Sequence, residues 1–522
     1  MTSPHTLSRR GFLGVAAVTR MPASSPVTVR AFDASGAAAK EDLLNTLLLM
    51  NADGRPFELL PTVKGDGMAT IEVPAEKFEV MMVLPVRGFG QVYLYADNGG
   101  PLYSAAHVPR GEFLLNYEFA RSRAVFVRRY MRAAEAEGVS FSPEIERRLE
   151  DGEHALDRAA KARDTVERVR HSNNSLAETM WAGEMAALER ARHRIARGGR
   201  RPGFLFGCNA FSYAKSEEYA RRYNALLNFA TLPFYRAQTE REERKPDYSR
   251  VEEILSKMAG TGTLTKGHPL VWFHRAGVPA FLKDKSWGDL KRSCRDYILG
   301  SVSRFRTRIH TWDVINEAHD WANDLGLDAE QLVEITRLAS ESAREADPTA
   351  FRVVNSCCTW GEYAARRRSY SGPLGRAART PFEYVRALDD AKVPYEAVGL
   401  QVYYPSRDML EIEKHLERFF RFGKPIHITE LGVSSSGEPV PSGEVRTPSR
   451  NVWHGESWSE AIQADWVEQF YTICYSKPEI QAITWWDFAD PSFIPHGGFL
   501  DKDFRPKAAY ERLAKLITGW RS

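Results

Sequence analysis

The feature that most constrains the fold is an alternation of short apolar runs with charged, helix-like stretches from about Gly203 to the C-terminus. Parallel strands are buried on both faces and read as continuous apolar runs, and helices separate them along the chain. The candidate strands are Phe204–Cys208, Leu226–Leu232, Gly262–Trp272, His310–Glu317, Phe351–Ser356, Ala397–Tyr404, Pro425–Gly432 and Ala482–Asp487. Eight such units in about 320 residues predict an α/β fold, a (β/α)8 TIM barrel, with its chemistry at the C-terminal ends of the strands.

Two of these runs carry a glutamate at or near their C-terminal end. Glu317 closes the fourth run, and Glu430 lies near the end of the seventh. Because such strands are buried on both faces, each charge must lie at the barrel mouth or be paired. Either glutamate alone is equally compatible with an ordinary salt bridge. Two glutamates on opposite strands of one barrel are the groups that cleavage of a glycosidic bond requires.

Glycosidic cleavage with retention needs an acid that protonates the leaving oxygen and a carboxylate that attacks the anomeric carbon. A separation of about 5–5.5 Å between the two carboxyl groups gives a covalent intermediate and retained configuration. We expect a raised pKa for the acid and a low pKa for the nucleophile, each set by its surroundings.

Four segments of the barrel region carry a family resemblance. They are Gly267–Trp272, Trp312–Glu317, Ile428–Leu431, and Trp486 with Gly498–Tyr510. In this order and spacing they resemble glycoside hydrolase family 10, best known for endo-1,4-β-xylanases. The resemblance covers roughly the last three fifths of the chain and implies a retaining β-glycoside hydrolase.

The resemblance also implies site residues. Glu317 falls at the acid/base position, Glu430 at the nucleophile position, and Asn316 where the family contacts the 2-hydroxyl of the sugar. Further positions implied at the substrate or beside the nucleophile are His268, Trp272, Gln401, Tyr403 and Trp486. Packing in the barrel core is the alternative for the two tryptophans, and a buried structural hydrogen bond is the alternative for His268.

The glycone side departs from the family pattern. After its second strand the family carries a Glu-Asn-Glu-Met-Lys run. At the corresponding residues 233–237 this chain reads Pro-Phe-Tyr-Arg-Ala, so the Lys and Asn of the family are missing. Tyr235 or Arg236 are the candidates to substitute for them.

Three further positions differ from the family. Tyr403 stands where the family has a His, and a phenol can donate to a carboxylate and keep it ionised. Phe273 replaces another common His, and Gly432 replaces a common Asp. The groups that cleave are therefore retained, while those that recognise the sugar are altered, and xylan is the substrate by family analogy alone.

The first 200 residues divide into three predicted parts. Residues 1–25 resemble a twin-arginine export signal, with Arg9 and Arg10 ahead of a short apolar run, so we expect an exported protein; a disordered basic N-terminus is the alternative. Residues 26–110 carry β-rich runs separated by Gly and Asp-Gly turns, which predict a small β-sandwich, either carbohydrate-binding or a structural appendage.

Residues 111–200 predict a helical connector ahead of a catalytic barrel over 201–522. Ser142 and Pro143 suit a helix start, and Ser175 with Glu178 predicts a capping box that begins another helix after Asn173 and Asn174. Periodic apolar residues indicate an amphipathic pair of helices, packed between sandwich and barrel or forming a coiled-coil arm.

The composition of the chain limits the kinds of partner that the protein is expected to bind. Lys and Arg exceed Asp and Glu by 71 − 68 = 3, which gives no electrostatic case for nucleic acid, and we find no run long enough to span a membrane. The five cysteines lack Cys-x-x-Cys spacing, so free thiols are the default and one disulfide is the alternative. We therefore expect a poly- or oligosaccharide substrate and neither cofactor nor metal.

The sequence favours a glycosidase over two other classes of protein. A non-catalytic carbohydrate-binding barrel is disfavoured because both glutamates and Asn316 are present. A metal-dependent hydrolase is disfavoured because its candidate ligands lie on different strands without ligand spacing. These ligands would be His268, His274, His319, Asp320 and His427.

Overall fold

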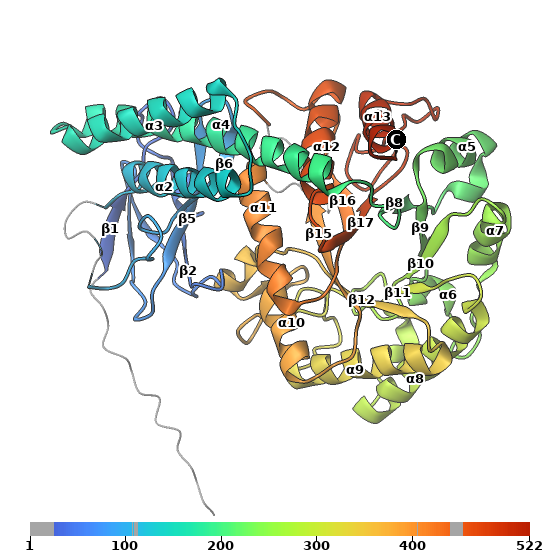
Figure 1. The fold of residues 1–522 in the computed structure, drawn as a ribbon. Helices are drawn as coiled ribbons and strands as arrows, with labels where there is room; N and C mark the ends of the chain where they lie inside the picture. Colours follow the sequence, from blue (N-terminus) through green and yellow to red (C-terminus); the bar gives the residue numbers. More distant parts are fainter. Residues whose placement is uncertain (1–25, 107, 109–112, 404–405, 439–452, 522) are drawn as a thin grey trace, which may run out of the picture.

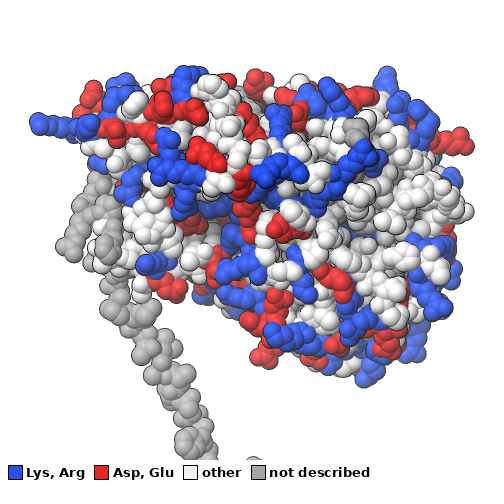
Figure 2. Space-filling view, viewed as in Figure 1, with Lys and Arg blue, Asp and Glu red and all other residues white. Residues whose placement is uncertain are grey.

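The computed structural model describes residues 26–106, 108, 113–403, 406–438 and 453–521 (Figure 1). The predicted export signal lies outside them. Among these residues, no helix has the length and apolarity needed to cross a membrane. On the face drawn in Figure 2, basic and acidic side chains are interspersed over the surface.

The C-terminal part is a closed barrel of eight parallel strands, which confirms the predicted fold. In chain order the strands are β8 (Leu205–Asn209), β9 (Phe229–Pro233), β10 (Leu264–His268), β11 (Thr311–Asn316), β12 (Phe351–Ser356), β15 (Ala397–Tyr403), β16 (Ile426–Gly432) and β17 (Ile480–Trp485). Each overlaps one predicted run. β10 ends at His268 rather than at Trp272, because the next residue, Pro269, has no N–H to give to the ladder.

Helices connect the strands and cover the barrel (Figure 1). They are α5 (Glu217–Leu226), α6 (Arg236–Thr239), α7 (Ser249–Met258), α8 (Trp287–Phe305), α9 (Ala329–Ala346), α10 (Pro381–Asp390), α11 (Met409–Arg418), α12 (Glu460–Tyr475) and α13 (Ala508–Arg521). Short 3-10 turns lie at η1 (Tyr213–Lys215), η2 (Ala280–Leu282), η3 (Glu362–Arg366) and η4 (Phe419–Phe422), and β13 (Arg368–Ser369) pairs with β14 (Gly372–Pro373). Capping boxes begin α9 at Asp328 and α10 at Thr380.

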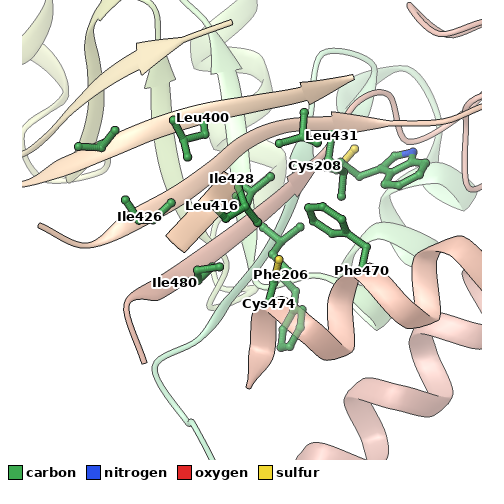
Figure 3. Close-up of a cluster of buried hydrophobic side chains, with 14 of the residues drawn as sticks. Phe206, Cys208, Leu400, Leu416, Ile426, Ile428, Leu431, Phe470, Cys474 and Ile480 are labelled. Carbon is green, nitrogen blue, oxygen red and sulfur yellow. The ribbon is translucent and has the colours of Figure 1, made fainter. Parts of the chain in front are cut away.

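The apolar core lies between the strands and this helical layer. In Figure 3, Ile426 and Ile428 of β16 lie among side chains of β8, α11 and α12, including Phe206, Leu416 and Phe470. These side chains are almost wholly shielded from solvent. The five cysteines, all among the described residues, are free thiols, which settles the disulfide alternative in favour of the default.

Two small sheets form the N-terminal part. One has the order β3 (Thr62–Gly65), β4 (Met68–Ile71), β1 (Val27–Arg30), β7 (Phe113–Leu114), and the other β2 (Leu48–Met50), β5 (Glu79–Val86), β6 (Gly90–Ala96). The short helix α1 (Glu41–Leu44) follows β1. Both sheets contribute to one apolar cluster with helices α2 (Leu115–Ala136) and α4 (Thr165–Gly198), so sheets and helices bury a common core. Residues 26–198 are called the N-terminal unit below.

Three helices, not the predicted pair, follow the sheets: α2 (Leu115–Ala136), α3 (Pro143–Lys161) and α4 (Thr165–Gly198). Ser142 precedes α3 with Pro143 in its first turn, as predicted. The capping box predicted at Ser175 is wrong, because α4 runs through it from its N-cap, Asp164. Asn173 does not end the helix, because its side chain hydrogen-bonds to Asp33 and Asn116 instead.

Candidate active site

The two predicted carboxylates lie at the C-terminal mouth of the barrel, one directly after β11 and the other on β16. Glu317 follows β11 directly with φ of 56°, and its N–H donates to the carbonyl of Asn355 at 2.9 Å. A non-glycine residue rarely adopts this left-handed conformation, so the backbone turns out of the strand at the glutamate itself. Glu430 lies within β16, and both side chains are more than nine-tenths buried.

Two neutral donors hold the Glu317 carboxylate. The Trp272 indole N–H donates to Oε2 at 2.9 Å, and the Gln401 amide donates to Oε1 at 3.0 Å. The same amide lies 3.3 Å from Oδ1 of Asn316. Because Trp272 lies in the segment after β10 and Gln401 lies on β15, two separate parts of the barrel mouth orient the carboxylate.

Glu430 also accepts two hydrogen bonds. The Tyr403 hydroxyl donates to Oε2 at 2.8 Å, and the Asn355 amide donates to Oε1 at 3.1 Å. Nε2 of His268 stands 3.8 Å from Oε1, beyond hydrogen-bonding distance. The nucleophile position therefore has donors on both oxygens, and one is the phenol that replaces the family's histidine.

The expected low pKa at Glu430 does not hold in this arrangement. Burial, followed by the nearby charge of Glu317, raises the pKa of Glu430 to about 8, although the Tyr403 hydrogen bond lowers it. Burial also raises the pKa of Glu317, against the hydrogen bonds from Gln401 and Trp272. Two buried carboxylates that repel each other titrate as a pair. When the pair holds a single proton, one carboxyl group is an acid and the other is a base, as the reaction requires.

A charged pair lies deeper in the barrel, beneath Glu430. Lys266 on β10 lies 2.9 Å from Oδ2 of Asp313 on β11, and Nδ1 of His268 lies 2.7 Å from the same oxygen. The Lys266 and His268 contacts outweigh burial and lower the pKa of Asp313, while burial lowers the pKa of His268. An ionised Asp313 only accepts, so the Nδ1–H of a neutral His268 donates to it and Nε2 faces Glu430 unprotonated.

Aromatic rings line one side of the mouth. The rings of Phe211, Tyr235, His268 and Trp486 form a circuit of edge-to-face contacts, with centroids 5.4–5.8 Å apart. Trp272 joins it through Tyr235 at 5.6 Å. These residues follow or close β8, β9, β10 and β17, so the wall occupies adjacent strands of the barrel.

All eight predicted site residues therefore gather at one mouth, although their roles at substrate stay predictions. Of the two candidates to replace the family's Lys and Asn, Tyr235 faces the site, and burial together with the charges of Glu430 and Asp487 raises its pKa. Arg236 points away, where it pairs with Glu240 at 2.7 Å and donates to the Ser293 hydroxyl at 2.8 Å. The Arg236 alternative is wrong because its guanidinium is satisfied within the helical layer.

The structure also adds residues that the sequence reasoning missed. Asn355, near the end of β12, joins Glu430 directly, and Asp313 orients His268. Both are polar residues inside apolar strand runs, the same signal that drew attention to the two glutamates. At Gly432, a Cβ would meet the Trp486 carbonyl oxygen at 2.9 Å, so the Asp common in the family has no room here.

A closed (β/α)8 barrel with two buried, hydrogen-bonded glutamates at its mouth defines the class of glycoside hydrolases. The family model for glycosyl hydrolase family 10 matches residues 213–516, and the chain belongs to that family. It is a retaining glycoside hydrolase.

Similar proteins are known from bacteria. Endo-1,4-beta-xylanase B of Thermotoga neapolitana is 26% identical over 337 residues, covering 60% of this chain and 88% of that protein. Endo-1,4-beta-xylanase B of Paenibacillus barcinonensis is 25% identical over 297 residues, covering 53% of this chain and 80% of that protein. Among solved structures, xylanase 10B from Thermotoga petrophila RKU-1 in complex with xylobiose has a TM-score of 0.47 at 20% identity, covering 64% of this chain and 97% of that one.

Proposed function

We propose that Glu430 is the nucleophile and Glu317 the acid/base of a double displacement. The observation that carries this is the position of both carboxylates at one barrel mouth, each held by two neutral donors. In the first step a Glu430 oxygen bonds to the anomeric carbon, the bond to the leaving oxygen breaks, and Glu317 gives its proton to that oxygen. In the second step Glu317 takes a proton from water, whose oxygen displaces Glu430 from the sugar.

The reactive form carries one proton, on Glu317. The donors from Tyr403 and Asn355 favour the ionised form of Glu430. In this proposal the sugar binds between the two carboxylates, and the side-chain amide of Asn316 donates a hydrogen bond to its 2-hydroxyl. The Gln401 amide donates a hydrogen bond to Oδ1 of Asn316 and so orients the Asn316 side chain.

The proposed substrate is a β-1,4-linked polysaccharide of the xylan type or its fragments. The support is family membership together with relatives named endo-1,4-beta-xylanases. A different β-glycan or a short oligosaccharide is the second candidate. Tyr235 favours it, because an aromatic ring stands where the family grips the glycone with charged and amide groups.

An assay against xylans, β-glucans and aryl β-glycosides tests both candidates. Wild-type protein should release reducing sugar from at least one of them, and Glu430→Gln and Glu317→Gln should abolish or strongly reduce turnover of unactivated substrates. Proton NMR of the first product should show the starting anomeric configuration. Full activity in Glu430→Gln would reject the assignment, and an inverted product would reject the double displacement.

We further propose that the chain is exported through a twin-arginine signal at residues 1–25. Replacing Arg9 and Arg10 by Lys should keep the protein in the cytoplasm of an expressing bacterium, while the unaltered chain is recovered outside it. Equal export of both would contradict the proposal.

A further inference from the structure

The N-terminal unit contacts the chain that leaves β15, the strand that ends in Tyr403. The backbone N–H of Tyr93 on β6 donates to the carbonyl of Ser406 at 3.0 Å. Ser406 lies three residues beyond Tyr403. A strand of the N-terminal sheet therefore makes a backbone contact with this loop rather than only touching the outer helices.

Arg407 anchors the same loop. Its guanidinium lies 4.0 Å from the ring centroid of Tyr93 and 4.3 Å from that of Trp360, and it donates to the Tyr95 hydroxyl at 2.8 Å. It also forms an ion pair with Glu362, and its side chain is only 3% exposed. A guanidinium stacked between two rings and hydrogen-bonded at its edge is held in position and orientation.

Asp408 and Met409, which follow Arg407, also contact the N-terminal unit. Asp408 caps α11 through the Leu410 N–H at 3.1 Å and pairs with Arg123 of α2 at 2.7 Å. The N–H of Met409 donates to Glu184 of α4 at 2.8 Å. Both members of the Arg123–Asp408 pair are buried, and a buried pair is costly to separate because each charge would be left without its partner.

A second loop, which leaves the strand that carries Glu430, meets the same unit. Nε2 of His454 lies 2.6 Å from Oε1 of Glu184, whose other oxygen holds Met409. The His454 ring packs against Trp181 at 4.4 Å. One buried glutamate of α4 thus connects the loops that follow β15 and β16, the strands of Tyr403 and Glu430.

We infer that the N-terminal unit is a positioning part of the active site: through Tyr93 and Tyr95 it holds Ser406 and Arg407, just beyond the end of β15, and so keeps the Tyr403 hydroxyl on Glu430. The inference rests on the proposed role of Glu430. It gives the N-terminal unit a function in the proposed reaction. A tethered carbohydrate-binding module would lack such a function, because it could be altered without changing the chemistry at the active site.

The test uses the pH profile of kcat/KM on an aryl glycoside with a good leaving group, in the full-length chain. Tyr403→Phe sets the reference: it should move the acidic limb upward by about one pH unit, since a hydrogen bond that favours the ionised nucleophile is lost. Arg407→Ala and Tyr93→Ala should each move the same limb in the same direction. In the double variant with Tyr403→Phe, Arg407→Ala should add no further shift.

Arg55→Ala is the matched control. Arg55 joins the same N-terminal unit to the barrel through Glu383 at 2.7 Å, away from the loop after β15. It should leave the acidic limb in place. An equal shift in Arg55→Ala, additive shifts in the double variant, or an unmoved limb in Arg407→Ala would overturn the inference. Where Arg407→Ala does not fold, Arg407→Lys and Tyr95→Phe are judged by the same shift. Failure of the proposed function itself shows differently, as undiminished turnover in Glu430→Gln.

Discussion

The Tyr403 hydroxyl donates a 2.8 Å hydrogen bond to Oε2 of Glu430, at a position where the family has a histidine. Burial, followed by the charge of Glu430, raises the pKa of Tyr403 well above its ordinary value, so the phenol stays neutral and donates this proton without changing its own charge. Its donation lowers the pKa of Glu430, yet burial and the charge of Glu317 raise that pKa to about 8. The balance between these effects makes the protonation of the pair the property most open to test.

Glu317→Gln should remove the basic limb of kcat/KM and leave the acidic limb near its wild-type position. Glu317 is protonated and neutral in the reactive form, so a neutral glutamine changes no charge beside Glu430 as Glu430 ionises; the charge of Glu317 raises the pKa of Glu430 only when both carboxylates are ionised. The substrate must be an aryl glycoside whose leaving group needs no proton, because the variant has no acid. The basic limb, which reports loss of the acid's proton, should disappear in the same profile. An acidic limb displaced to lower pH would show that Glu317 is already ionised while Glu430 titrates, and would contradict the proposed position of the proton on Glu317.

Glu430→Gln should be more stable than wild type at alkaline pH. The folded pKa of about 8 lies above the ordinary value of 4.5, so the native state holds a proton that the unfolded chain has released. Wild-type stability is therefore fully present below about pH 4.5 and falls, by up to about 1.4 kcal/mol per pH unit, until the pH passes 8. Urea unfolding at pH 5 and pH 9 should show the variant's advantage growing with pH. A difference that is constant across this range would contradict the raised pKa.

Much of the barrel was predictable because its signals are local. Each strand is a buried apolar run, and Glu317 and Glu430 stood out because a charge in such a run needs a special environment. The long helix α4 was mispredicted because Asn173 resembles a helix stop until its partners, Asp33 and Asn116, are brought beside it. The pKa of Glu430 depends on burial and on a group on another strand, so local sequence gives no measure of it.

Asn355→Ala should lower kcat/KM by about tenfold or more. Its amide donates to Glu430 at 3.1 Å, and hydrogen bonds to charged groups contribute ~1.5–3 kcal/mol. Ser356→Ala is the control on the same strand, because its buried hydroxyl makes no hydrogen bond among the described residues. Steady-state kinetics of both variants decide the point, and comparable losses in the two would assign the effect to strand packing.

Gly432→Asp, which restores a residue common in the family, should reduce activity rather than improve it. A Cβ at this position would lie 2.9 Å from the Trp486 carbonyl oxygen and 3.0 Å from a side-chain carbon of Ile494. Two neighbours must then shift, and one of them belongs to the residue whose ring packs against His268 at 5.4 Å. The loss should be largest for substrates that depend on stacking against Trp486, and kcat/KM on a panel of aryl glycosides measures it. Gly432→Ala separates the causes: a similar loss in the alanine variant identifies the crowding, whereas normal activity there would assign the defect to the added charge and contradict the steric explanation.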